Sequence, residues 1–236
     1  MKLCFLGRGS AFCDRMGNTS AYLREGGRML LLDCGESVFH ALMTRSALDG
    51  VTELYVAVSH THSDHCGSLG TLLQYCIYGL HIPLTVVVPE DGAYIASLRQ
   101  LLLLFGAKED QIHFLPAREL SGFSSFSSMR IVPTEHVPGM QAFSFVFETP
   151  AGGVFYSADT KTPAQLQDFI ASHPDFEAAY MDSAETTYPG TVHYSVGELA
   201  EMIPPELRSR VFIMHMNSEA CIAKGQALGF SPVSVD

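Results

Sequence analysis

The sequence predicts an α/β fold in which β-sheets pack between helices in one domain spanning residues 1–236. The first observation is an alternation of strand-like and helix-like segments from one end of the chain to the other. The second is composition: hydrophobic residues make up 47% of the 236 residues and charged residues 17%. Such a chain can bury a sizeable core and is too apolar to be disordered.

Eleven short apolar segments have the residue types of β-strands. They cover residues 2–6, 20–24, 29–33, 54–58, 83–88, 111–115, 129–133, 141–148, 153–157, 178–182 and 211–215. The clearest pair is a hairpin of 141–148 with 153–157. Phe143, Phe145 and Phe147 recur at every second position of its first strand, which predicts that the three rings share one face.

Six segments have helical periodicity, namely residues 36–46, 64–78, 92–105, 163–172, 195–203 and 218–226. In the second segment, apolar residues from Leu69 to Ile77 fall at helical spacing and form one stripe. The fifth begins with Ser195 and Glu198, the pattern of a capping box. We find no repeats in the sequence.

Charge and cysteine content narrow the class of protein. Acidic residues outnumber basic ones by 11, which disfavours binding to long nucleic acids or anionic membranes. No apolar run reaches the roughly 18 residues of a membrane span, and the start lacks the features of a signal peptide. The six cysteines include no C-x-x-C pair, so we expect reduced thiols and a cytoplasmic protein.

One short segment has the residue types of a metal site. His60, His62, Asp64 and His65 lie within six residues, between a predicted strand and a predicted helix. Imidazole and carboxylate groups suit zinc, manganese or iron. The spacing could supply two metal ions a few Å apart.

Three further candidate ligands each follow a predicted strand. They are His136, Asp159 and His215. Loops after strands gather at one edge of a sheet, where binding sites are commonly built. We therefore expect all seven residues to lie together, with two divalent metal ions as cofactors, zinc being the first expectation and manganese or iron the alternatives.

These residues, in this order, resemble the metal-binding signature of the metallo-β-lactamase fold over nearly the whole chain. The segment from Leu31 to Gly35 is similar to the family's first motif, in which the aspartate, here Asp33, supports the metal loop. The resemblance implies an α/β, four-layer αββα sandwich with the metals at one edge of the sheets.

The resemblance also implies individual roles. One metal would be held by His60, His62 and His136, and the second by Asp64, His65 and His215, with Asp159 bridging the two. A hydroxide between the metals would be the nucleophile of a hydrolase, since paired metals acidify water and stabilise developing negative charge.

Within the family, the glycine-rich start resembles the ribonuclease Z branch and its small phosphodiesterase relatives. That branch has a late carboxylate–histidine pair, in which the histidine protonates the leaving group. Asp182 and His193 occupy the matching places, with aspartate where ribonuclease Z has glutamate. Asp14 and Arg15, in the glycine-rich start, are open to a role in substrate contact.

We therefore predict a dinuclear phosphodiesterase that acts on a small phosphodiester or nucleotide. No long basic segment resembles the arm with which ribonuclease Z clamps transfer RNA. Three alternatives stay open: a ribonuclease Z-like nuclease, a thioester hydrolase of the glyoxalase II kind, and a metal-binding module without turnover. A glyoxalase II-like enzyme would need a further helical domain, for which few residues follow His215. A homodimer is compatible with this branch.

Overall fold

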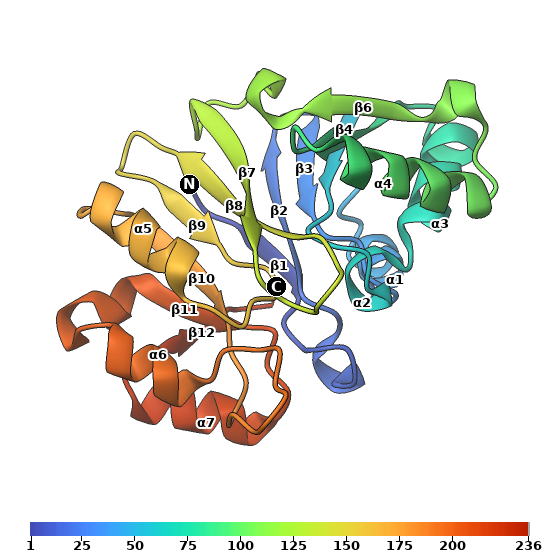
Figure 1. Cartoon of the computed structure of the whole chain (residues 1–236). Coiled ribbons are helices and arrows are strands. Elements are labelled where there is room, and N and C mark those ends of the chain that lie inside the picture. Colours follow the sequence, from blue (N-terminus) through green and yellow to red (C-terminus); the bar gives the residue numbers. More distant parts are fainter. Residues whose placement is uncertain (236) are drawn as a thin grey trace.

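The computed structural model describes residues 1–235 and contains two six-stranded β-sheets that pack face to face (Figure 1). The first sheet has the order β1-β2-β3-β4-β5-β6. Its strands are β1 (Cys4–Gly7), β2 (Ser20–Glu25), β3 (Arg28–Leu32), β4 (Glu53–Ala57), β5 (Leu84–Val88) and β6 (His113–Pro116).

The second sheet has the order β12-β11-β10-β9-β8-β7. Its strands are β7 (Ser128–Thr134), β8 (Ala142–Glu148), β9 (Val154–Tyr156), β10 (Ala178–Asp182), β11 (Val211–Met214) and β12 (Ser231–Pro232). The eleven predicted strands all form, and β12 is an additional short edge strand.

The two sheets repeat one topology. In each, the first three strands pair antiparallel and the remaining strands pair parallel. The sequence shows no repeat, because many apolar residues satisfy the same strand pattern. As a result, parallel strands in both sheets direct their carboxyl ends to the same edge of the sandwich.

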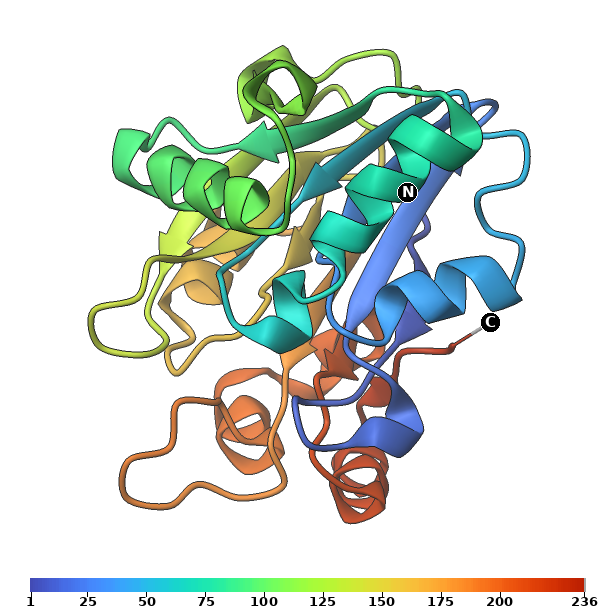
Figure 2. The ribbon, with the colours of Figure 1, turned by 90° about the vertical axis from the view of Figure 1, so that its right-hand side faces the viewer.

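Helices cover the outer face of each sheet and complete the predicted four layers (Figures 1 and 2). The first sheet is covered by α1 (Val38–Thr44), α3 (Leu69–Tyr75) and α4 (Gly92–Leu104), and the second by α5 (Ala164–Ser172), α6 (Val196–Met202) and α7 (Glu219–Ala227). The capping box forms: Ser195 Oγ accepts from the Glu198 N–H at 3.2 Å. No helix within residues 1–235 is both long and apolar enough to cross a membrane.

The core between the sheets follows strand alternation. Leu30 and Leu32 of β3 face the second sheet, while Met29 and Leu31 pack under the helices. Phe145 and Phe147 lie in the core between the sheets, and each buried ring stabilises the fold by about 1.5–3 kcal/mol. Phe143 instead packs on Tyr94 of α4, with ring centroids 4.7 Å apart.

The single helix expected over 64–78 is wrong. The chain forms α2 (Ser63–Cys66), breaks, and then forms α3, which continues as a π-helix over Cys76–Leu80. The break arises because the Ser68 N–H donates to Cys34 O at 3.0 Å, outside its own helix. The metal loop is thereby fastened to the segment that follows β3.

Candidate metal centre

The loop after β4 is held by a buried carboxylate. Asp33 accepts hydrogen bonds from the Ser59 N–H at 2.7 Å and the Ser59 hydroxyl at 2.9 Å. Its second oxygen also lies 2.9 Å from His65 Nδ1. Asp33 therefore fixes both the start of the loop and the orientation of one imidazole, in agreement with the supporting position that the resemblance implied.

Four predicted ligands meet in a first cluster at the edge of the sheets. His62 Nδ1 lies 2.9 Å from His60 Nε2 and 3.2 Å from His136 Nε2. Asp159 Oδ2 lies 3.8 Å from the His60 nitrogen and 3.6 Å from the His136 nitrogen. The four ligand atoms all lie within 4.8 Å of one another, a spacing that one metal ion can bridge.

A second cluster forms on the other oxygen of the same aspartate. Asp159 Oδ1 lies 3.1 Å from His65 Nε2 and 3.3 Å from His215 Nε2. Asp64 Oδ2 lies 3.4 Å and 3.2 Å from the same two nitrogens. Asp159 is thus the only one of the seven predicted ligands that belongs to both clusters.

Backbone strain marks this edge of the molecule. Five non-glycine residues within 1–235 have a positive φ, and three of them, Asp33, Ala158 and His215, lie within two residues of the end of a strand at the edge where the predicted ligands meet. A non-glycine residue in this conformation costs about 1–3 kcal/mol and persists only where its surroundings enforce it. His215 is held in part by Thr19, whose hydroxyl accepts from the His215 N–H at 3.1 Å.

The donor set fits divalent cations. His65 Nε2 and Asp159 Oδ1 are buried and have no hydrogen-bond partner of suitable geometry among residues 1–235, although they face each other at 3.1 Å. A cation between them would satisfy both atoms. Burial also holds the pKa of His60 well below its usual range and lowers that of His136. Both imidazoles are therefore neutral, the form that binds metal.

Nearby carboxylates raise the pKa of two other histidines. Burial would lower the pKa of His215, but Asp159, Asp182 and Asp64 outweigh it and raise the pKa to about 10. Burial would also lower the pKa of His65, but the carboxylates of Asp159 and Asp33 raise it well above its usual range. A divalent cation bound among these residues would take the place of the protons, because ligating imidazoles must be deprotonated.

Asp182 and His193 form a pair beside the clusters. His193 Nδ1 lies 2.8 Å from Asp182 Oδ2. Burial would lower the pKa of His193, but the carboxylate of Asp182 outweighs burial and raises it. The other oxygen of Asp182 lies 3.4 Å from His215 Nδ1. Asp182 therefore contacts both the predicted proton donor and a predicted metal ligand, a dual position that the sequence did not indicate.

The clusters open into a cavity of about 460 Å³, within the range of small-ligand sites. Asp159, His193 and His215 line it, and so do the aromatic residues Phe12 and Tyr188. The Phe12 side chain is fully exposed.

Comparison with known proteins decides the family. The family model described as "Anti-Pycsar protein Apyc1" matches residues 1–231. The chain belongs to the anti-Pycsar Apyc1 family. Among its relatives, the anti-Pycsar protein Apyc1 of Bacillus phage 010DV004 is 30% identical over 260 residues, which cover 98% of this chain and 95% of the relative.

Solved structures confirm the fold of this Apyc1-family chain. The metallo-β-lactamase fold protein YhfI from Bacillus subtilis matches with a TM-score of 0.71 and 15% identity. The match covers 99% of this chain and 95% of the YhfI chain. The short form of human tRNase Z matches with a TM-score of 0.68 and 19% identity. The match covers 100% of this chain and 97% of the tRNase Z chain. The metallo-β-lactamase fold expected from the sequence is therefore correct.

Sequence reasoning missed part of the cavity wall in this Apyc1-family chain. Phe12 and Tyr188 lie in loops without periodicity, so only their exposure in the structure identifies them. Asp14 and Arg15, which the sequence left open to substrate contact, do not line this cavity. They line a neighbouring one instead.

Proposed function

We propose that the protein is a dinuclear metal-dependent phosphodiesterase that opens a small cyclic phosphodiester, with cyclic nucleotides as the substrate class. The observation that carries the proposal is the Asp182–His193 pair, 2.8 Å between oxygen and nitrogen, whose histidine lines the cavity into which the metal-ligand clusters open. A thioester hydrolase has less need of a separate proton donor there, because a thiolate leaves without a proton. Membership of the anti-Pycsar Apyc1 family favours a cyclic nucleotide.

The seven ligand-type residues would hold two divalent cations. His60, His62 and His136 would bind one and Asp64, His65 and His215 the other, with one oxygen of Asp159 directed to each. When bound, the two cations supply an acidified water and stabilise the negative charge that develops on the phosphoryl oxygens.

The part of His193 follows from its hydrogen bonding. Its Nδ1 is engaged by Asp182, which leaves Nε2 as the nitrogen available to a ligand in the cavity. As the water oxygen bonds to phosphorus, the bond from phosphorus to the sugar oxygen breaks. The Nε2 proton of His193 passes to that oxygen and yields a hydroxyl group, while the proton lost by water goes to solvent and His193 is reprotonated.

Size and charge support a small substrate. The cavity of about 460 Å³ suits a mononucleotide, and the net charge of −11 opposes a long polyanion. A homodimer would be compatible with this function and is not required by it.

The test compares two substrates that differ in how much their leaving group needs a proton. For His193→Ala we expect kcat/KM on a 3′,5′-cyclic nucleotide to fall roughly 10²- to 10⁴-fold. The loss on bis(p-nitrophenyl) phosphate should be small, because p-nitrophenolate leaves without a proton. Metal content should not change.

His113→Ala is the matched control, since His113 is exposed at the start of β6 and away from the cavity. It should leave both rates unchanged. Equal losses of His193→Ala on the two substrates, or loss of metal, would show that His193 is not the proton donor. Absence of phosphodiester hydrolysis by the metal-loaded wild type would defeat the proposed function itself.

A further inference from the structure

The two most exposed phenylalanine or tyrosine side chains within residues 1–235 both border the metal cavity. They are Phe12, which is 100% exposed, and Tyr188, which is 65% exposed. The other two exposed rings, Tyr78 and Phe105, lie outside this cavity. One exposed ring is ordinary on a protein surface, but two at the mouth of one cavity form an apolar surface that a ligand can cover.

Neither of these two rings has a partner in the described part of the chain. The rings of Phe12 and Tyr188 contact no other aromatic ring there, and the Tyr188 hydroxyl forms no hydrogen bond. The other exposed rings are engaged: the Tyr78 hydroxyl accepts from Gln111 Nε2 at 3.5 Å, and Phe105 packs against Gly70. Packing within residues 1–235 therefore does not explain the exposed rings at the metal cavity.

Two loops carry these rings, and both are fastened to the segment that follows the last predicted metal ligand. In the loop of residues 8–17, the Ser10 N–H donates to Met216 O at 3.1 Å, and the Met216 N–H donates to Arg8 O at 2.9 Å. In the loop of residues 184–195, the Glu185 N–H donates to Asn217 Oδ1 at 3.1 Å. The blue loop after β1 and the orange loop before α6 both lie in the lower part of the molecule (Figures 1 and 2).

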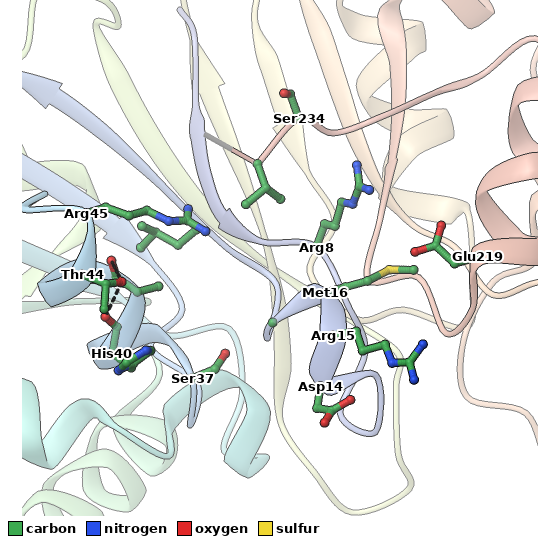
Figure 3. A pocket seen from close by; sticks show the side chains of 14 residues that line it. Arg8, Asp14, Arg15, Met16, Ser37, His40, Thr44, Arg45, Glu219 and Ser234 are labelled. Carbon is green, nitrogen blue, oxygen red and sulfur yellow. Dashed lines mark hydrogen bonds between the residues drawn. The ribbon is translucent and has the colours of Figure 1, made fainter.

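The loop of residues 8–17 has a fixed backbone and borders two cavities. Its ends are joined where the Gly9 N–H donates to Gly17 O at 2.8 Å. The side chains of Asp14–Met16 line a neighbouring cavity (Figure 3), whereas Phe12 lines the metal cavity. Phe12 is therefore the large apolar side chain that this loop contributes to the metal cavity.

The loop of residues 184–195 also carries parts of the metal site. It is closed where the Ala184 N–H donates to Tyr194 O at 2.8 Å. Within it, Val192 O lies 3.1 Å from Nδ1 of the predicted ligand His136, and the proposed proton donor is the next residue. A ligand that contacts Tyr188 is therefore held by the same short loop that supports the reacting atoms.

The remaining lining favours contact with the face of a ring over contact with its edge. The acidic and histidine side chains that line the metal cavity are the predicted metal ligands and His193, and no Arg, Lys, Glu or Gln of the described chain lines it. Aromatic side chains bind nucleobases by stacking, which needs a flat ligand and no charge. The complementary ligand has an anionic group for the metals and a flat heterocycle for the two rings.

We propose that Phe12 and Tyr188 form a base subsite, in which the nucleobase of the substrate stacks on the two rings while its phosphodiester group lies at the metal clusters. This inference rests on the proposed function and adds the residues that bind the part of the substrate remote from phosphorus. The base does not change during the reaction, so its stacking stabilises substrate and transition state alike. Loss of the stacking therefore raises KM more than it lowers kcat.

The test uses two substrates with the same phosphodiester and the same leaving group. One is adenosine 3′,5′-cyclic phosphate, and the other is methyl riboside 3′,5′-cyclic phosphate, which has no base. On the first, Phe12→Ala and Tyr188→Ala should each lower kcat/KM by about 5- to 100-fold, mainly through KM. On the second, both variants should match the wild type. Tyr188→Phe keeps the ring and should retain activity, whereas Tyr188→Leu keeps an apolar side chain and should lose most of it.

Two control variants accompany these. Tyr78→Ala removes a ring that is 64% exposed, nearly as much as Tyr188, but lies outside the metal cavity, and it should leave both substrates unaffected. His193→Ala should slow both substrates equally, since their leaving groups are identical. Binding of adenosine to the metal-loaded protein, measured by calorimetry against ribose, gives a readout without turnover. Its Kd should rise about 5- to 100-fold in the two alanine variants.

Several results would overturn the base subsite. These are equal kcat/KM of the wild type on the two substrates, equal losses of the aromatic variants on both, or an unchanged Kd for adenosine in both variants. Loss of a dimer in these variants with unchanged kinetic constants would assign the rings to an interface between copies instead. Hydrolysis of neither substrate by the wild type would defeat the proposed function, whereas the adenosine titration would still decide the subsite.

Discussion

Asp33→Asn should loosen the metal cluster that contains His65 far more than the other. The substitution keeps the shape of the side chain, and asparagine tolerates the φ of 64° found at this position. The carboxylate, however, accepts from Ser59 and faces His65 Nδ1 at 2.9 Å. An amide has a single acceptor oxygen and cannot replace all of these contacts.

The magnitude follows from the lost contact. A hydrogen bond to a charged group contributes about 1.5–3 kcal/mol. Converted at 1.4 kcal/mol per factor of ten, this raises the Kd of the metal beside His65 by roughly 10- to 100-fold. The cluster of His60, His62 and His136 should change much less, since Asp33 reaches it only through Ser59, whose hydroxyl lies 3.0 Å from His60 Nδ1.

Stepwise zinc affinities from competition with a chromophoric chelator would measure both constants. Asp49→Asn is the matched control, because Asp49 is exposed and remote from the metal edge. Unchanged affinities in Asp33→Asn, or equal weakening of both metals, would refute the reasoning.

Three further outcomes are expected. Asp159→Ala should abolish turnover and reduce bound metal without unfolding the protein, measured by elemental analysis and circular dichroism; near-normal rates would contradict its place in both clusters. Metal present at about 1,000 times its Kd should stabilise the folded protein by about 4 kcal/mol, so its removal by a chelator should lower Tm by about 8–16 °C. An unchanged Tm in calorimetry would contradict the inference that these residues bind divalent cations. Burial raises the pKa of Glu25, but hydrogen bonds from Ser125 and Ser124 outweigh it and lower the pKa from 4.5 to about 2. The ionised carboxylate of Glu25 therefore stabilises the fold above pH 4.5, and this stabilisation is lost as the pH falls toward 2. Between these pH values, urea titrations should show a smaller loss of unfolding free energy for Glu25→Gln than for the wild type. Equal losses in the two proteins would contradict the prediction.

The meeting of the seven ligand-type residues could be predicted because each lies at a boundary that the sequence marks clearly. His136, Asp159 and His215 follow apolar strands, and strand ends meet at one edge once the sheets form. The hairpin of β8 and β9 was equally clear, since Phe143, Phe145 and Phe147 alternate along its first strand.

Other features depend on contacts between distant segments. The break between α2 and α3 arises from the bond of Ser68 to Cys34, which local periodicity does not reveal. Phe12 and Tyr188 are exposed loop aromatics, and loops leave no pattern from which to infer which cavity they border. The second role of Asp182, toward His215, likewise appears only when β10 and β11 are aligned.

The division of ligands between the two sheets has a consequence for synthesis of the chain. His60, His62, Asp64 and His65 come from the loop after β4, whereas His136, Asp159 and His215 come from the second sheet. A nascent chain exposes four imidazole and carboxylate donors long before their partners leave the ribosome. The cluster around His65 can be completed only after β11 has emerged, so a product truncated before His215 lacks one of that cluster's four donors.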